Sequence, residues 1–359
     1  MTAFQRVYLS TNRTEWWNGH LAAALARTVQ VVPCSLARPN QPGHPVETDI
    51  NQLIRPADGP GAFYLGSLDQ MFAGITGLPV LTAIWTDYCT NGNFGRECLP
   101  LFDVVFCSQQ DSVAELRQAG IAQVEWLPFA FDATLANHPE AAKIYDIGFV
   151  GSLEQPKTRA ERIAILGRLE RLYRLNDYRQ PVFGDAMMGI YNQSRIVVNM
   201  PVQGGVNMRT FEAMASGALL LTKRVGNGQE DLFKDGTHLV TYDGMDDLMD
   251  KVVYYLGHEE ERTALAAAGR REVLAHHTYD HRAARVLEVM GGASRGRSHD
   301  PATQAAAYGV YYDYLGRSDL LGGLALAPGV PLAKRLRLAA RAGVKFLRQV
   351  SGRRAGPAS

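Results

Sequence analysis

The segment from 207 to 233 combines residue types and spacings that point to ligand chemistry. Its first part, NMRTFEAMASG (207–217), has apolar residues at helical spacing and ends at Gly217, so we expect a short helix followed by a buried strand. Arg209 and Glu212 are three residues apart and are therefore neighbours on that helix. A carboxylate placed there, at the end of a parallel sheet, can accept hydrogen bonds from two ribose hydroxyls. The alternative is an exposed Arg–Glu pair that contributes little.

The elements that must position this helix follow a repeated strand–helix order. Near-continuous apolar runs, typical of strands buried on both faces, precede residue 130, and helical stretches such as 18–28 and 109–120 lie between several of them. This alternation predicts a parallel sheet. The expected strands of this first part are 6–11, 29–34, 61–66, 78–87, 103–108 and 124–129.

The pattern restarts after a polar stretch at 131–143. Four further strands are expected at 145–152, 195–200, 218–223 and 238–243, with helices at about 159–173, 186–194, 207–216, 246–257 and 259–276. We therefore predict an α/β protein with two Rossmann-like parallel-sheet domains that face a cleft. The expected boundaries are 1–140, 143–292 and, for a linker and C-terminal helical extension, 293–359. Open sheets of this kind bind ligands at the carboxyl ends of their strands.

The composition excludes several classes of protein. Hydrophobic residues make up 46% and charged residues 20% of the chain, which excludes a disordered or fibrous protein. The net charge of +1 argues against bulk nucleic-acid binding. The four cysteines do not have the spacing of a zinc site, and we expect buried thiols. Because no signal peptide or long apolar run is evident, we expect a cytoplasmic protein.

Two strings in the second half resemble a known family. NMRTFEAMASGALLLT (207–222) and the segment from EDLFKDGTHLVTYDG to HHTYDHR (230–282) resemble the C-terminal donor domain of CgeB-type glycosyltransferase-like proteins. That group is similar to the retaining glycosyltransferases of GT-B architecture, which have two Rossmann-like domains. The resemblance begins at Tyr145 and is strongest over its second half, whereas the first 140 residues fit the architecture only in their order of strands and helices.

The resemblance implies roles for individual residues of the second domain. In the larger family two glutamates separated by seven residues flank the donor, and the second one binds the ribose. Glu212 matches the second position, but the first is occupied by Gly204, which puts in doubt how the transferred sugar is held. We expect the backbone amides of the 204–207 loop, among them Gly204, Gly205 and Asn207, to contact the sugar or phosphate as a small anion-binding nest.

The same resemblance places the loop GSLEQPKTR (151–159) at the donor diphosphate. A turn at Gly151 and Ser152 lets the backbone approach the phosphates, and Lys157, Arg159 or Arg209 would neutralise the departing group. A plain left-handed turn is the alternative interpretation of the Gly-Ser pair.

Two other groups in the second domain have both a functional and a structural interpretation. Tyr191 and Asn192 end a helix before a strand, and we expect them near the base and ribose, or else in structural packing. His276, His277 and His281 suggest a metal site, but the resemblance places them at a helix junction. We therefore expect no metal and no cofactor besides the donor.

The first domain offers candidates for the acceptor side. The loop STNRTEWWNGH (10–20) contains Trp16 and Trp17, which suit sugar stacking or, equally, anchoring of the next helix. Asp87 ends the fourth expected strand, where active-site groups collect. Asp87 and His20, with Arg209 from the second domain, are the catalytic candidates, and a satisfied structural role is the alternative for the first two.

The segment 331–350 predicts a basic amphipathic helix. Leu332 and Leu336 lie on its apolar stripe, and eight basic residues but no acidic one fall between Pro331 and Arg354. We expect it to lie on the anionic inner face of a membrane, to dock on the protein body, which carries the remaining net charge of −7, or to stay solvated.

These observations predict a glycosyltransferase of hexosyltransferase type that moves a sugar from a nucleotide-sugar donor to a glycan, lipid-linked or other acceptor. The resemblance implies retention, and fixed basic groups make a metal unnecessary. If Asp87 or His20 acts as general base, inversion follows. Two alternatives remain open: a GT-B sugar-nucleotide epimerase, and a non-catalytic scaffold in envelope polysaccharide assembly, which the missing acid at Gly204 favours. No nucleic-acid partner is expected.

Overall fold

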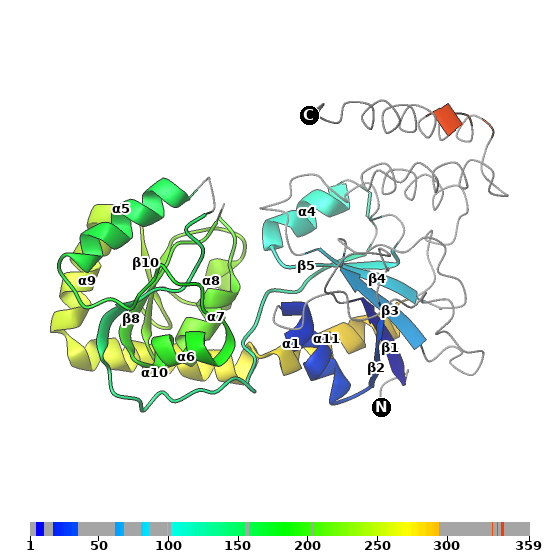
Figure 1. The fold of residues 1–359 in the computed structure, drawn as a ribbon. Helices are drawn as coiled ribbons and strands as arrows, with labels where there is room; N and C mark the ends of the chain where they lie inside the picture. The colour runs from blue at the N-terminus through cyan, green and yellow to red at the C-terminus, as the bar shows by residue number, and fades with distance from the viewer. Residues whose placement is uncertain are drawn as a thin grey trace, which may run out of the picture.

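The computed structural model describes large parts of both expected domains. The described residues are 5–10, 17–34, 62–67, 80–85, 99, 102–118, 120–121, 123–154, 158–202, 204–293, 332, 336, 339 and 340. Within them the chain forms two lobes side by side, each built on a parallel sheet (Figure 1). The predicted α/β class with two parallel sheets is therefore confirmed.

All six strands expected in the first domain are present and pair in parallel. They are ordered β2-β1-β3-β4-β5-β6, so the sheet grows outward in both directions from the β1–β3 pair. Val7 and Phe106 are completely buried, as the near-continuous apolar runs predict for a sheet covered on both faces. The strands are β1 (Arg6–Ser10), β2 (Gln30–Cys34), β3 (Ala62–Ser67), β4 (Val80–Trp85), β5 (Val104–Cys107) and β6 (Val124–Trp126), and the helices are α1 (Trp17–Ala26) and α4 (Gln110–Gln118).

The second domain contains the four expected strands in the order β10-β9-β8-β7, again all parallel. Each strand is followed by at least one helix, so the helices cover both faces of the sheet (Figure 1). The strands are β7 (Tyr145–Gly148), β8 (Ser194–Asn199), β9 (Leu219–Lys223) and β10 (Val240–Tyr242). The helices are α5 (Arg159–Glu170), α6 (Gly184–Asn192), α7 (Met208–Ala215), α8 (Gln229–Leu232), α9 (Met245–Gly257) and α10 (Glu259–His276).

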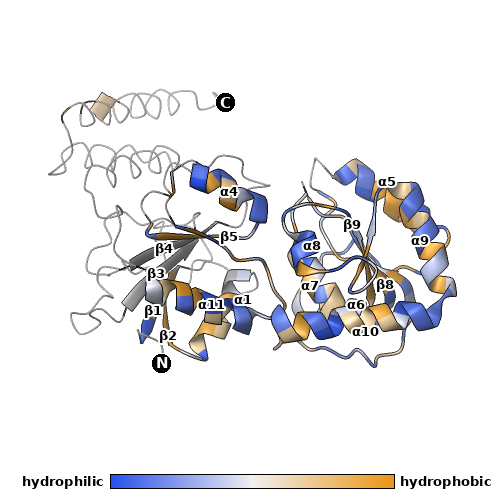
Figure 2. Cartoon of the chain, turned by 180° about the vertical axis from the view of Figure 1, so that it is seen from behind, coloured by the Kyte–Doolittle hydropathy of each residue, from blue (hydrophilic) through white to orange (hydrophobic). Residues whose placement is uncertain are grey.

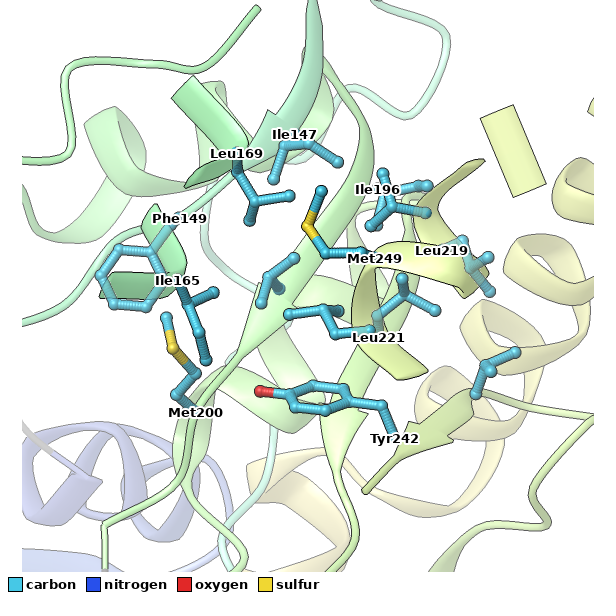
Figure 3. Packing of buried hydrophobic residues seen from close by; sticks show 14 of the residues in the cluster. Ile147, Phe149, Ile165, Leu169, Ile196, Met200, Leu219, Leu221, Tyr242 and Met249 are labelled. Carbon is cyan, nitrogen blue, oxygen red and sulfur yellow. The ribbon is translucent and has the colours of Figure 1, made fainter. Parts of the chain in front are cut away.

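Two apolar clusters hold this second sheet between its helices. On one face, Ile165 and Leu169 of α5 and Met249 of α9 pack on Ile196 and Leu221 of the strands (Figure 3). On the other face the cluster combines residues of α6 and α7 with the alternate strand positions. Figure 2 shows that α5, α9 and α10 carry both apolar and polar residues around the apolar strands. Burial of both faces makes the sheet a rigid support for the loops at its carboxyl edge.

The last described helix, α11 (Tyr279–Gly292), returns to the first domain. Val286 and Met290 share a core cluster with Leu21 and Leu25 of α1, so residues 279–292 pack on the first sheet although they follow the second domain in sequence. Within the described residues the chain thus crosses between the lobes twice. The two crossings are joined, because Phe131 N–H donates to His277 O (2.9 Å) and Tyr279 N–H donates to Phe131 O (2.9 Å).

The C-terminal segment is described at only four positions. Residues 332, 336, 339 and 340 are helical, and Leu332 and Leu336 are exposed. No helix among the described residues has the length and apolar character needed to cross a membrane. Cys107 is buried, as predicted, and its Sγ donates to Gln109 O (3.4 Å), whereas the side chains of the other three cysteines lie outside the described residues.

Candidate donor site at the edge of the second sheet

Helix α7 begins where strand β8 ends. Asn199 is the last residue of β8, and the chain then passes through the 204–207 loop into α7, which begins directly after Asn207. Phe211 and Met214 are buried in the core beneath the helix. This apolar packing places the first turns of α7 at the carboxyl edge of the second sheet, as the sequence predicts.

A buried network of polar side chains is centred on Asn199. Its Nδ2 donates to Asn207 Oδ1 (3.0 Å), Thr210 Oγ1 (3.2 Å) and Thr222 Oγ1 (3.2 Å). Its Oδ1 accepts from Asn207 Nδ2 (3.1 Å) and Arg209 Nη1 (3.0 Å). Because a buried amide must be satisfied in this way, the network ties the first turn of α7 to the ends of β8 and β9.

The guanidinium of Arg209 extends over the loop that follows β7. Its carbon Cζ lies 4.6 Å from the centre of the Phe149 ring, within the range of a cation–π contact. A Cβ atom at Gly151 would lie 2.0 Å from Arg209 Nη2, so the guanidinium occupies the space of a side chain at 151. Arg209 Nε is buried without a hydrogen-bond partner among the described residues. The structure thus brings together Arg209 and Gly151, two parts of the expected diphosphate site.

Glu212 follows Arg209 on α7 and is buried, with 7% of its surface exposed. Burial raises the pKa of its carboxyl to about 7, and the positive charges of Arg209 and His20 offset this effect only in part. After burial itself, the same carboxyl is the main electrostatic cause of the raised pKa of Tyr279. No described residue donates a hydrogen bond to it. Glu212 is thus a buried carboxyl with the guanidinium of Arg209 as its charged neighbour on the same helix.

His20, on α1 of the first domain, is paired with Asp132 of the first crossing between the lobes. Their Nδ1 and Oδ2 atoms are 2.6 Å apart, and Thr134 donates its N–H and hydroxyl to Asp132 Oδ1 at 2.9 and 2.7 Å. Burial would raise the pKa of Asp132, but the hydrogen bonds from His20 and Thr134 bring it to about 2. Because a carboxylate only accepts hydrogen bonds, the Nδ1 atom of His20 carries the proton in this pair. The imidazole ring also stacks on the ring of Tyr279, with the two ring centres 5.5 Å apart.

Two backbone amides of the 204–207 loop are hydrogen-bonded to other parts of the protein. Gly204 has φ of 76°, and a Cβ atom there would meet nothing within 4 Å. Gly205 N–H donates to Val202 O (3.3 Å), and Val206 N–H donates to Gln109 Oε1 of the first domain (3.1 Å). Two of the four amides expected to form an anion nest are therefore engaged within the protein, and that expectation now rests on Gly204 and Asn207.

Residues 148–288 match the family model described as "Glycosyl transferase-like". Sucrose-phosphate synthase from Thermosynechococcus elongatus has a similar structure, with 13% identity, coverage of 79% of this chain and 98% of that chain, and a TM-score of 0.55. Anabaena Alr3699/HepE in complex with UDP and glucose is also similar, with 12% identity, coverage of 80% of this chain and 100% of that chain, and a TM-score of 0.54. TarM of S. aureus has 10% identity, the match covers 67% of this chain and 56% of that chain, and the TM-score is 0.52. No match to a curated protein sequence was found.

The structural comparisons establish the GT-B fold of the chain, and the match to the glycosyl transferase-like model lies within its second domain. The matched residues 148–288 contain the Asn199 network, Arg209 and Glu212. They agree with the glycosyltransferase part of the resemblance seen in the sequence, while its narrower CgeB-type part stays a prediction.

Of the other predicted donor residues, Tyr191 lies near Arg209 and Glu212, whereas Ser152, Arg159 and Asn192 have other surroundings. Ser152 accepts a hydrogen bond at its carbonyl from Arg162 Nη1 (2.5 Å), and Arg159 is exposed at the start of α5. Tyr191 is buried, and its pKa is raised by burial, with Arg209 and Glu212 as its charged neighbours. Asn192 is buried, and its carbonyl accepts from a lysine. Lys157 lies outside the described residues.

In the first domain the predicted residues are only partly described. Asp87 and Trp16 lie outside the described residues, whereas Trp17 packs edge-on against Phe129, with ring centres 6.5 Å apart, which favours its role as a core anchor.

The histidines near the end of α10 suggest a metal site in the sequence. His277 is buried against Phe211 and Phe233, and burial lowers its pKa to about 3. Within the described part of the chain no group of three His, Cys, Asp or Glu side chains is arranged to hold a metal.

Three residues at the site were not predicted from the sequence. Asn199 ends a strand that was expected, so an amide at a carboxyl edge was the available signal. Asp132 precedes Thr134 in a turn, where Asp two residues before a bonded amide is common. Gln109 has no comparable local signal, because its partner Val206 lies 97 residues away.

Proposed function

We propose that this protein is a glycosyltransferase that transfers a hexosyl group from a nucleotide-sugar donor bound by the second domain. The observation that carries the proposal is the buried carboxyl of Glu212 beside Arg209 at the carboxyl edge of the second sheet. In this proposal the Glu212 carboxylate accepts hydrogen bonds from the ribose hydroxyls. The complex of Anabaena HepE with UDP and glucose has the same fold and supports a nucleotide and a sugar as the ligands.

In this proposal the donor diphosphate lies between the guanidinium of Arg209 and the backbone at Gly151. Asn199 holds Arg209 Nη1 and leaves the rest of the guanidinium to bind phosphate oxygens. A fixed cation at the leaving group stabilises the charge that develops as the glycosidic C–O bond breaks. We therefore propose a transfer that needs no metal ion. Unchanged turnover after treatment with EDTA is the expected result, and loss of turnover would exclude this part.

On the acceptor side, we assign His20 to orient the acceptor hydroxyl, with Asp132 fixing its tautomer. The acceptor is a glycan, a lipid-linked sugar or another hydroxyl compound. Retention of the anomeric configuration is expected from the resemblance, in which case the departing phosphate takes the acceptor proton. An inverted product, identified by NMR of the anomeric centre, would instead make His20 the general base.

We further propose a cytoplasmic protein whose C-terminal helix binds anionic membrane. Leu332 and Leu336 are exposed on the predicted apolar stripe of a strongly basic segment. Flotation with vesicles that contain anionic lipid, but not with neutral vesicles, is the expected result. Equal recovery with both kinds of vesicle would contradict the proposal.

The decisive experiment is a thermal-shift screen of UDP-, GDP-, dTDP- and CMP-sugars, followed by calorimetry on Glu212→Gln. We expect one nucleotide class to raise the Tm of the wild type, and the variant to bind it about 10- to 100-fold more weakly, since charged hydrogen bonds contribute roughly 1.5–3 kcal/mol each. The matched control is Glu230→Gln, because Glu230 is an exposed carboxylate of α8. Unchanged affinity in Glu212→Gln would remove this carboxylate from the site, and a screen without any shift would favour the non-catalytic alternative.

A further inference from the structure

The two domains meet through the residues around the start of α4. The side-chain amide of Gln109, which is 4% exposed, bonds the backbone of Val206 in both directions. Gln109 Nε2 donates to Val206 O (3.3 Å), and Val206 N–H donates to Gln109 Oε1 (3.1 Å). The side chain of Gln109 thus satisfies both backbone groups of Val206, as a neighbouring strand would do in a sheet. In Figure 1, α4 lies on the side of the first lobe that faces the second.

A second route reaches the other end of the same loop. Asp111 N–H, in the first turn of α4, donates to Asn227 Oδ1 (3.3 Å), and Asn227 Nδ2 donates to Gly204 O (2.7 Å). Asn227 has a left-handed backbone with φ of 55°, and its side chain bonds a residue of each domain. We call Gln109, Asp111 and Asn227 the domain clasp.

Glycines allow this close approach. A Cβ atom at Gly205 would lie 3.2 Å from Gln109 Nε2, which is tighter than ordinary contact. A Cβ atom at Gly228 would lie 2.4 Å from the ring of Trp126, on β6 of the first domain. At Gly205 and Gly228 the backbone of the second domain therefore lies directly against side chains of the first domain.

The clasped loop leads directly into the donor site. Asn207, at its end, belongs to the Asn199 network that holds Arg209, and Glu212 follows on the same helix. We propose that Gln109 is a positioning residue of the first domain that fixes the 204–207 loop, so the sugar end of the donor site is complete only when the domains are clasped. This inference rests on the proposed function, and it assigns the recognition of the sugar, as distinct from the nucleotide, to both domains together.

The test compares two ways of opening the clasp. Gln109→Met keeps the length of the side chain but removes both bonds to Val206. Asn227→Gly keeps the left-handed backbone but removes the bonds to Asp111 and Gly204. For each variant, calorimetry measures the affinity for UDP and for UDP-glucose, or for the best-binding pair from the nucleotide-sugar screen. Hydrogen exchange measured without ligand follows the amides of the 204–207 loop.

The control is Gln110→Ala. Gln110 Nε2 donates to Asp231 Oδ2 (2.6 Å), so this variant also removes a contact between the domains, but one that is exposed and does not touch the loop. We expect it to behave like the wild type in both measurements. Tm values of all variants establish that each one is folded before affinities are compared.

We expect Gln109→Met to speed exchange of the Val206 amide and to weaken binding of the nucleotide sugar about tenfold, with the nucleotide alone changed less than twofold. Asn227→Gly is expected to act in the same direction. The proposal is overturned if exchange at Val206 stays slow, if nucleotide and nucleotide sugar lose affinity equally, or if Gln110→Ala has the same effect. If the wild type binds no nucleotide sugar, the proposed function fails and the sugar part of this inference with it, while hydrogen exchange still decides whether Gln109 fixes the loop.

Discussion

The carboxyl edge of the second sheet and the facing part of the first domain contribute to the candidate site in different ways. At the second sheet, Asn199, Arg209 and Glu212 come from one strand and the helix that follows it. Their hydrogen bonds join residues that are close together in the sequence. The first domain contributes isolated side chains. His20 reaches Asp132 across 112 residues, and Gln109 reaches Val206 across 97.

This difference has a physical consequence for how each region varies. A candidate site made of one strand, one loop and one helix has local geometry, so a sequence pattern can encode it, and the family model matches this domain over 148–288. The first domain acts through a few contacts placed by the whole fold, and its strands can carry many sequences. A shared donor with variable acceptors would produce this arrangement, and the predictions below test whether the division between the domains holds.

The largest effect is expected from the pH dependence of stability caused by Glu212. Its pKa is raised from 4.5 to about 7 in the folded chain, so between these values the folded state holds a proton that the unfolded state has lost. Stability therefore falls as pH rises through this window, by on the order of 3 kcal/mol in all. Donor affinity should rise over the same window, because the charged carboxylate is the stronger acceptor of ribose hydroxyls.

The measurement is urea unfolding at several pH values, for the wild type and Glu212→Gln. The variant lacks the titrating group, so the difference between the two curves isolates Glu212 from His277, whose lowered pKa gives the opposite slope. Parallel curves from pH 4.5 to 7 would show that the carboxyl is not desolvated. That result would remove the main evidence for a specialised site in the second domain.

A slightly smaller effect is expected from Asn199→Ala. The change leaves the buried groups of Asn207, Thr210 and Thr222 without their shared partner, and we expect a loss of about 2–3 kcal/mol in the free energy of unfolding. Asn199→Asp keeps an acceptor for Arg209 and should bind the donor better than the alanine variant. Equal stability of Asn199→Ala and the wild type, measured by chemical denaturation, would mean that the network does not organise the donor site.

Much of this domain could be predicted from its sequence, for the same reason that it is local. The spacing of Arg209 and Glu212 on a short helix, and the strand on either side of it, follow from periodicity and a terminal glycine. The amides of Gly205 and Val206 were expected to be open to a ligand, and only the fold reveals that they are bonded. Helix α11 was not among the expected helices, and an apolar stripe in the sequence would not have identified the first sheet as its partner.

The first domain is tested by His20→Gln. The proposed role concerns the acceptor, so we expect transfer to fall about 30-fold, equivalent to about 2 kcal/mol, with donor affinity unchanged within twofold. Asp132→Asn should have a weaker effect in the same direction, because it keeps the shape of the pair but not its charge. Turnover is measured as nucleotide release with a panel of acceptors. A loss of donor affinity in His20→Gln would contradict the division between domains, since His20 would then belong to the donor site.

The smallest effect is expected from Gly151→Ala, and it tests whether Arg209 and the loop after β7 act as one unit. The added methyl group would lie 2.0 Å from Arg209 Nη2, and the flexible end of the arginine can move aside, so the fold should survive while the guanidinium is displaced. We expect affinity for UDP to fall about tenfold and affinity for uridine to stay the same, because only the phosphates lose their cation. Gly167→Ala on α5 is the matched control, since a Cβ atom there meets nothing within 4 Å. A double-mutant cycle with Arg209→Ala tests whether the effect acts through Arg209. If it does, adding Gly151→Ala to Arg209→Ala should not lower the affinity for UDP further. Additive losses of affinity would instead show two independent contacts with the donor.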